Sequence, residues 1–313
     1  MPADIAAFPG PAPVAVSPRR RHGAQIPGWV SWSLAGPSVV LLVLLMLLPI
    51  AAIVLLSFTD YRFGALEVSF VGLDNYVDLN SDRAFWRALG NTFTYVAMVV
   101  PASVFLGLLL AVLINGLTRG RKIYQLIFFL PVTATLVAMA TVWKYLLHGT
   151  IGPFNLLLKS WGLPAIDFFS DPDLVLGGLA LINIWSLAGF NMVLFIAGLT
   201  AIPEELYDAA SVDGMENPLD RFFSVTLPLL GPTTMFVIIT STITAFKVFD
   251  TVAVITRGGP RRGASDVLLY TTYLEGFTYF RMGSAAAMTV VFLAIIMIFA
   301  FLQARVLDRK VHY

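Results

Sequence analysis

The chain lacks cysteine, carries little charge and contains no Gly-Lys dipeptide, and each absence excludes a class of function. Without cysteine, the 313 residues provide no disulfide, no thiolate nucleophile and no cysteine metal site. Without Gly-Lys, there is no phosphate-binding loop of the Gly-x-x-x-x-Gly-Lys type, so any ATP hydrolysis must take place on another chain. The three histidines, His22, His148 and His312, fall in a tail, a loop and the C-terminus, where we expect no metal or acid–base role.

Apolar residues dominate what is present. They make up 58% of the chain and charged residues only 12%, too few to cover the surface of a soluble domain of this size. The net charge of +1 argues against a nucleic-acid partner. Residues 1–28 are rich in Pro and Ala and contain Arg19-Arg20-Arg21, so we predict a disordered cytoplasmic tail rather than a cleaved signal peptide. Residues 29–313 are predicted to form one transmembrane domain.

Six hydrophobic runs are each long enough to cross a bilayer, for which about twenty apolar residues suffice. They predict an all-α membrane protein. The predicted spans are Leu34–Phe58, Thr92–Ile114, Tyr124–Leu147, Leu174–Thr200, Leu229–Phe249 and Ser284–Gln303.

The basic residues predict the orientation. Three arginines precede the first span, which usually dominates insertion, and Arg119, Arg121 and Lys122 crowd one very short loop. We therefore expect both termini in the cytoplasm, which also places the loop at about 201–228 there.

That loop has the signals of a helix–turn–helix. Pro203 with two following glutamates suits a helix start, and Gly214 can end the helix in a left-handed conformation. Asn217-Pro218 then combines an N-cap with a proline at the first helical position. A polar loop that keeps this pattern is typical of an element on which another protein docks.

The same loop resembles a known family. Asp208-Ala209-Ala210, three further residues, Gly214 and then Val225-Thr226-Leu227-Pro228 resemble the EAA loop of permease subunits in binding-protein-dependent ABC importers. It departs from the family pattern in having Asp208 for Glu, Met215 for Ala, and ten rather than nine residues between Gly214 and Val225.

Two other segments are similar to the carbohydrate-uptake branch of that family, which includes permeases of the maltose and glycerol-3-phosphate type. They are Phe70–Tyr76 and the stretch from Phe249-Asp250 to Thr256-Arg257-Gly258-Gly259-Pro260.

The resemblance implies a six-transmembrane-helix ABC importer permease core with cytoplasmic coupling helices, in a bacterial cytoplasmic membrane. It implies a transport subunit, not an enzyme, that forms half of the translocation path for a sugar or sugar-like solute. The implied partners are a second homologous permease, two ATP-binding subunits, an extracytoplasmic substrate-binding protein and membrane lipid. ATP and Mg would bind to the ATP-binding subunits, and this chain itself would bind no cofactor. The implied coupling residues are Glu205, Asp208, Ala209, Ala210, Asp213 and Gly214.

Polar groups inside the fourth and fifth spans are candidates for the substrate path, because lipid penalises them unless they face the bundle or water. By resemblance to maltose-type permeases, the contact positions fall on Asn183, Ser186, Leu187, Phe190, Ser241, Thr244, Ala245 and Val248. A purely structural role stays open, since Asn183 can bond across helices and hydroxyls can bond their own backbone.

Lys247 also has two interpretations. It can extend to the membrane surface and pair with Asp250, or it can meet an anionic substrate such as glycerol-3-phosphate or a glycerophosphodiester. A secondary transporter is a more distant alternative, because ion coupling needs intramembrane ionisable groups and usually comes with internal repeats. Only Lys247 lies clearly within a span, and we find no repeat.

Overall fold

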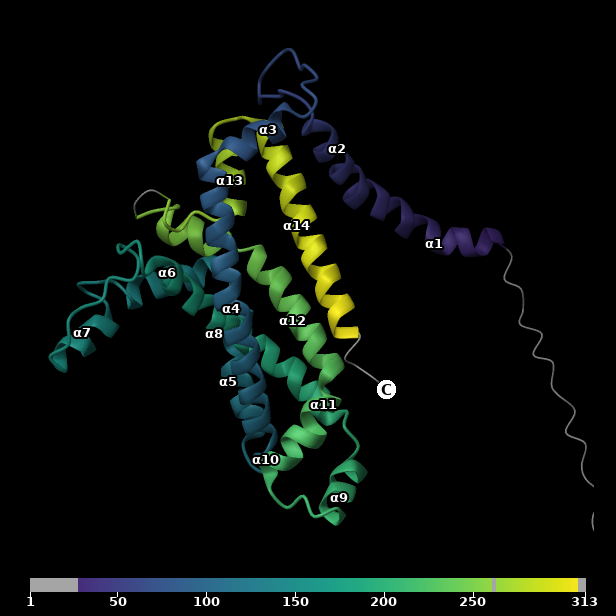
Figure 1. Ribbon diagram of the computed structural model, residues 1–313, viewed down its shortest axis with the longest axis vertical. Helices are drawn as coiled ribbons and strands as arrows, with labels where there is room; N and C mark the ends of the chain where they lie inside the picture. Colours follow the sequence, from purple (N-terminus) through teal and green to yellow (C-terminus); the bar gives the residue numbers. More distant parts are fainter. Residues whose placement is uncertain (1–27, 261–262, 309–313) are drawn as a thin grey trace, which may run out of the picture. The chain divides into compact units, whose positions relative to one another are not determined.

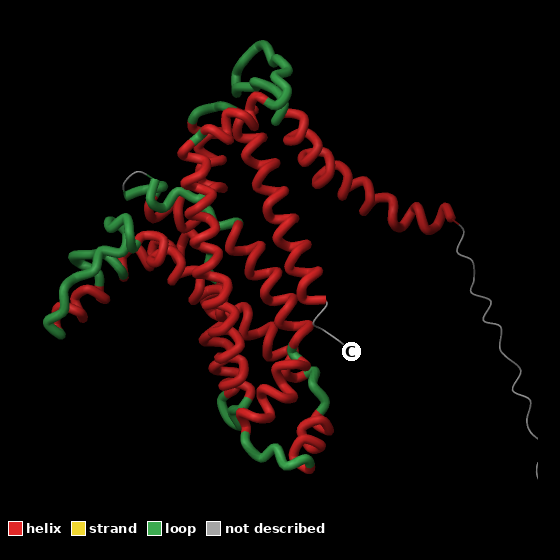
Figure 2. Tube along the Cα trace, in the orientation of Figure 1, coloured by secondary structure: helices red, strands yellow, loops and turns green. Residues whose placement is uncertain are grey.

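The computed structural model describes residues 28–260 and 263–308, so the predicted disordered tail lies outside the described residues, except for Gly28. The chain divides into two units, residues 1–51 and 52–313. The described residues form helices, turns and loops with one isolated bridge, Thr59–Phe70, and no strand (Figure 2).

The first predicted span is helical. It consists of α1 (Gly28–Leu42), a π turn η1 (Val43–Leu47) and α2 (Leu48–Leu56), and its last residues belong to the second unit. Pro49 cannot donate a hydrogen bond to the turn before it, and that turn is the wide π turn.

Three long helices organise the second unit (Figure 1). They are α4 (Arg83–Asn115), α8 (Val175–Thr200) and α14 (Met282–Asp308). Tyr95 of α4 and Phe195 of α8 are among the largest fully buried side chains, and they lie in two separate buried apolar clusters. Gly107 of α4 lies so close to Asn191 of α8 that a Cβ would overlap its side chain. Small residues at such crossings let membrane helices pack by direct contact.

The third and fifth predicted spans are bent. The predicted third span, Tyr124–Leu147, consists of α5 (Arg121–Thr133) and α6 (Leu136–Leu146), which meet at 100° and make one candidate span only if the bent pair is counted together. Pro131 lacks the N–H that would continue the helix, and the Thr135 hydroxyl caps α6 by accepting from the Ala138 N–H.

The fifth span begins earlier and ends sooner than predicted. Residues 218–229 include α10 (Pro218–Arg221), η2 (Phe222–Thr226) and α11 (Leu227–Leu229), and they meet α12 (Gly231–Phe246) at 68°. The described residues hold four helices that are long and apolar enough to cross a membrane, or six candidate spans if each bent pair is counted as one.

Short elements cap the second unit at its two ends (Figure 1). We call them the α3 end and the α9 end. The α3 end includes α3 (Asp74–Ser81), α13 (Leu268–Tyr273) and η4 (Leu274–Thr278), and the α9 end includes α9 (Glu204–Val212) and α10. The remaining elements are α7 (Pro153–Ser160) and η3 (Val252–Thr256).

Candidate functional site

The candidate path residues of α8 lie at different depths. Asn183 is buried and its Nδ2 donates to the Tyr95 hydroxyl of α4 at 2.7 Å. Leu187 is also buried, whereas Ser186 is half-buried and Phe190 is 37% exposed. The two buried side chains therefore hold α8 within the bundle, and the other two face an open side of it.

The candidates of α12 divide in the same way. The predicted stripe of Ser241, Thr244, Ala245 and Val248 contains three buried residues and one exposed residue, Thr244. The Ser241 hydroxyl donates to Asn191 Oδ1 at 3.2 Å and accepts from Asn191 Nδ2 at 3.0 Å. The Thr244 hydroxyl instead donates to the Thr240 carbonyl of its own helix at 2.8 Å.

Tyr95 and Asn191 were not among the residues selected from the sequence. Tyr95 lies in the second span, and no local pattern links it to a residue 88 positions away. Asn191 was visible as a polar residue in the fourth span, but only its pairing with Ser241 marks it as a helix–helix contact.

Lys247 ends α12 as its C-cap, and its side chain is exposed. The predicted ion pair with Asp250 is not present in the structure, because no carboxylate of the described residues lies within 4.0 Å of the Lys247 ammonium. The helix stops one residue earlier, at Phe246, so the i, i+3 geometry that would bring the two side chains together is lost. Figure 1 shows α12 ending well short of the α3 end that α14 reaches.

The predicted helix–turn–helix is confirmed at the α9 end. Gly214 has φ +86°, and the Met215 N–H donates to the Ala210 carbonyl at 2.9 Å, which closes a Schellman-type helix end. Asn217 caps the next helix, since its Oδ1 accepts from the Leu219 N–H at 3.0 Å. Pro203 is the N-cap rather than the first helical residue.

Side-chain contacts join the two parts of this loop. The Arg221 Nε donates to the Met215 carbonyl at 2.6 Å, and the Tyr207 hydroxyl lies 3.1 Å from the Thr226 hydroxyl. Of the predicted coupling residues, Ala210 is buried, while Glu205, Asp208, Ala209, Asp213 and Gly214 are exposed. The loop therefore presents carboxylates on a braced scaffold.

A second polar cluster lies beyond η3, in the motif region after Thr256. The Asn91 side chain of α4 donates to the carbonyls of Gly263, Ala264 and Asp266 at 2.9–3.3 Å. Burial raises the pKa of Asp266 above its usual 3.8, and the Arg87 guanidinium, 3.6 Å away, opposes that shift only in part. The start of α4 thus holds the loop that leads into α13.

Comparison with known proteins identifies the chain. Residues 77–313 match the family model described as binding-protein-dependent transport system inner membrane component. The probable ABC transporter permease protein YesP of Bacillus subtilis is 37% identical, over 85% of this chain and 86% of that protein. The sn-glycerol-3-phosphate transport system permease protein UgpA of Agrobacterium fabrum is 31% identical, over 90% and 95% of the two chains.

A third relative and a solved structure are also transporter proteins of this kind. The sulfoquinovosyl glycerol transport system permease protein SmoG of Agrobacterium fabrum is 30% identical, over 91% of this chain and 96% of that protein. A chain of a bacterial alginate ABC transporter, solved in complex with an alginate pentasaccharide-bound periplasmic protein, shares the fold with a TM-score of 0.81 at 23% identity, covering 90% of this chain and 95% of that chain. The protein belongs to the family of binding-protein-dependent transport system inner membrane components, as a permease subunit of an ABC transporter.

Proposed function

We propose that this chain forms half of the translocation path of an ATP-driven importer for a sugar or sugar-like solute, which an extracytoplasmic binding protein delivers. In ABC importers the ATPase is a separate subunit, and this chain is the transport subunit. A second homologous permease and two ATP-binding subunits, which bind ATP and Mg, complete the assembly in this proposal. Two of the named relatives are permeases of transport systems for sn-glycerol-3-phosphate and for sulfoquinovosyl glycerol, and they support a solute of this kind.

One observation carries the placement of the path: the exposed, unpaired ammonium of Lys247 on a membrane helix. A charged or hydrogen-bonding group that faced lipid would be costly, so such groups face a neighbouring subunit or a water-filled passage. Ser186 and Phe190 are four residues apart on α8, so they share one side of that helix. Thr244 on α12 and Lys247, the C-cap residue that follows the helix, are both exposed. The reciprocal bonds between Asn191 and Ser241 hold the two helices together behind these residues.

In this proposal the four open residues meet the solute. Hydroxyl groups can bond to its hydroxyls, and the Phe190 ring can stack on an apolar ring face. The buried candidates support the path from behind by packing α8 and α12 and the residues just after α12; they are Asn183, Leu187, Ser241, Ala245 and Val248.

A second candidate is an anionic solute, such as a phosphorylated polyol, and Lys247 favours it because a free ammonium suits a phosphate or sulfonate. The discriminating experiment measures uptake of labelled glycerol-3-phosphate and of a neutral disaccharide, in vesicles that contain the reconstituted transporter. Lys247→Met should abolish uptake of the anion and spare the neutral sugar. Lys144→Met is the matched control, since Lys144 is an exposed lysine in the last turn of another helix, α6. If Lys247→Met transports every accepted solute at the wild-type rate, Lys247 does not contact the solute.

We further propose that α9 and α10 are coupling helices that lie in the cytoplasm and dock on an ATP-binding subunit, with both chain termini on the same side. The support is the braced loop with its exposed carboxylates at Glu205, Asp208 and Asp213. The test is solute-stimulated ATP hydrolysis by the reconstituted complex. A double Glu205→Gln, Asp208→Asn variant should lose that stimulation while its permease still inserts, and unchanged stimulation would contradict the assignment.

A further inference from the structure

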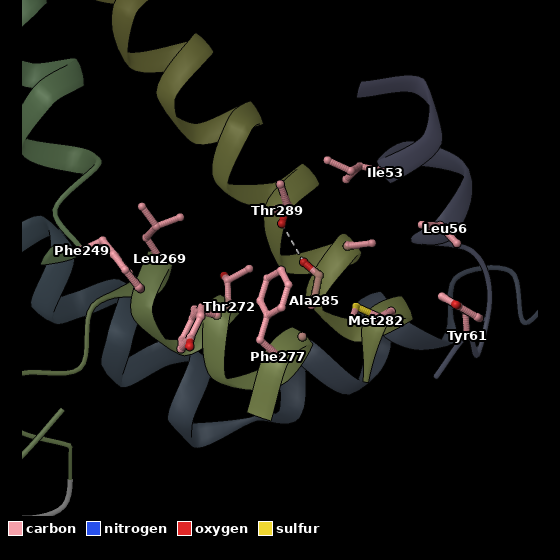
Figure 3. Close-up of a pocket in the computed structure, with 13 residues that line it drawn as sticks. Ile53, Leu56, Tyr61, Phe249, Leu269, Thr272, Phe277, Met282, Ala285 and Thr289 are labelled. Atoms are coloured by element: carbon pink, nitrogen blue, oxygen red, sulfur yellow. Dashed lines mark hydrogen bonds between the residues drawn. The ribbon is translucent and has the colours of Figure 1, made fainter. Parts of the chain in front are cut away.

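An apolar pocket of about 510 Å³ lies between α2, α13 and α14 in the second unit (Figure 3). One side is a face of α14 that carries Met282, Ala285 and Thr289, spaced three and four residues apart. Phe277 and Leu56 are among the side chains that line the rest of it. The volume is within the range of small-molecule sites, about 300–1,000 Å³.

A second pocket, of about 330 Å³, adjoins the first and is polar. The two pockets share Tyr61, whose carbonyl accepts from the Gly283 N–H at 2.9 Å. The first turn of α14 contributes to both, with Met282 in the apolar pocket and Gly283 in the polar one. Figure 3 shows Tyr61 and Met282 at one edge of the apolar pocket.

The polar pocket contains charges that the protein does not pair. Asp74 and Asp78 are four residues apart on α3, so both carboxylates are on one side of that helix, where like charges repel. Neither carboxylate, nor the Arg62 guanidinium beside them, has an ion-pair partner within 4.0 Å among the described residues. Arg281 is different, because its guanidinium is bound to the Glu275 carboxylate at 2.5 Å.

The walls of the polar pocket are held in place. Asn75, which follows Asp74 on α3, is buried, and its Nδ2 donates to the carbonyls of Ser57 and Thr59, each at 2.9 Å. The carboxylates are therefore presented by a helix that is tied to the end of the first span. A cation placed between them would relieve their repulsion without moving the backbone.

We propose that the two pockets together bind one phospholipid whose head group carries a primary ammonium, the phosphatidylethanolamine class. Its acyl chain occupies the apolar pocket along α14, and its head group crosses Tyr61 into the polar pocket. The ammonium lies between Asp74 and Asp78 and donates hydrogen bonds to both, while the lipid phosphate meets Arg62. Asp60 also lines this pocket, and its Oδ1 accepts from the Ser69 N–H at 2.7 Å. Three carboxylates against one guanidinium, all without an ion pair among the described residues, favour this zwitterion over an anionic head group.

The arrangement suits a lipid better than a soluble solute. The apolar pocket offers almost no hydrogen-bonding group, so a polyhydroxylated solute would lose its water without compensation there. An acyl chain has no polar group to dehydrate, and it keeps the head group at the α3 end, where the helices α2 and α14 both have an end. A choline head group has the same charges but no N–H donor, so it provides a test of the hydrogen bonds.

The test is native mass spectrometry of the full-length chain, with the subunits that co-purify, exposed to equal amounts of three lipids with identical acyl chains. The lipids are phosphatidylethanolamine, phosphatidylcholine and phosphatidylglycerol. We expect phosphatidylethanolamine to be retained roughly 1.5-fold to fivefold more than the other two, which is the range that an exposed ion pair contributes. Equal retention of all three would overturn the proposal. Soluble glycerophosphoethanolamine, which has no acyl chain, should not displace the lipid, and displacement by it would also contradict a lipid site.

The head-group contacts are tested by the double variant Asp74→Asn, Asp78→Asn. It should lose the preference among the three lipids, while Glu67→Gln, an exposed carboxylate outside both pockets, should keep it. A double variant that retains the wild-type preference would refute the assigned contacts. Because these changes lie on an exposed helix surface, they test the head group even if variants of the apolar pocket fold poorly.

The acyl pocket is tested by Thr272→Trp, which places a large ring in it. Retention of every lipid should fall by at least threefold. Thr94→Trp is the matched control, because each threonine donates its hydroxyl to the carbonyl four residues earlier, at 2.8 Å for Thr272 and 2.9 Å for Thr94, and Thr94 is exposed on α4 outside the pocket. Equal retention by the two variants would show that the acyl chain lies elsewhere. These measurements need no transport, so their result is independent of the proposed function.

Discussion

Ser241 and Thr244 lie one helical turn apart on α12. We expect the loss of the Ser241 hydroxyl to lower stability and the loss of the Thr244 hydroxyl to lower transport. The Ser241 hydroxyl and the Asn191 amide are both 0% exposed, and they exchange two hydrogen bonds of 3.0 and 3.2 Å. Ser241→Ala removes both bonds and leaves a buried amide without its partner. Interhelical hydrogen bonds in membrane proteins contribute about 0.6 kcal/mol on average and up to about 1.7 kcal/mol.

We therefore expect Ser241→Ala to lower the free energy of unfolding by about 1–2 kcal/mol, because an unpaired buried group adds to the lost bond. Thr244→Val should change it by less than about 0.5 kcal/mol, since Thr244 is exposed and bonds only its own helix. The effects on transport should be the opposite of the effects on stability. Thr244→Val should lose uptake, and Thr244→Ser should retain it. Ser241→Ala should transport in proportion to the amount of folded protein present.

The assay combines unfolding in a denaturing detergent with uptake by vesicles from the same preparation. A double-mutant cycle with Asn191→Ala isolates the pair, and the double variant should lose about 1 kcal/mol less than the sum of the two single variants. If Ser241→Ala is as stable as wild type but does not transport, the Ser241 hydroxyl serves the solute and the division between packing and path residues is refuted.

Four further outcomes follow from the structure. Gly214→Val should abolish solute-stimulated ATP hydrolysis without loss of membrane insertion, because φ +86° strains a branched side chain by about 1–3 kcal/mol, and normal coupling would contradict the docking role of α9. Cysteines introduced singly at the exposed positions Glu67 and Val212 should be labelled from opposite sides of the membrane, Val212→Cys only from the cytoplasm, and the reverse labelling would overturn the orientation. Gly258→Ala should destabilise the protein by about 1–3 kcal/mol, because a Cβ would overlap the Asp266 carboxylate and φ is +81°, and a wild-type melting curve would count against the tight loop. Because its pKa is raised on folding, the Asp266 carboxyl binds its proton more tightly in the native state than in the unfolded chain. Its contribution to the free energy of unfolding should therefore fall as pH rises from 3.8 through the native pKa. Asp266→Asn should flatten the measured slope of stability against pH over that window.

Sequence signals predicted local structure well where the interacting groups are only a few residues apart. The helix–turn–helix at the α9 end was predictable, because Gly214 and Asn217 act on backbone groups one to five residues away. The Lys247–Asp250 pair was not predicted correctly, since its i, i+3 spacing brings side chains together only within a continuous helix, and α12 ends at Phe246.

The sequence alone determined the class of the protein, the approximate membrane spans and the helix–turn–helix of the loop, because hydrophobic length, helix caps and turn residues are properties of short segments. Tertiary structure decided the 100° bend between α5 and α6 and the separation of Ser241 from Thr244. It also brought Asn183 to Tyr95 and left the Asp74 and Asp78 carboxylates unpaired beside an apolar pocket. The physical reason is that helical periodicity places a side chain around its own axis, whereas the neighbour that covers it, or fails to cover it, comes from a segment far away in the chain.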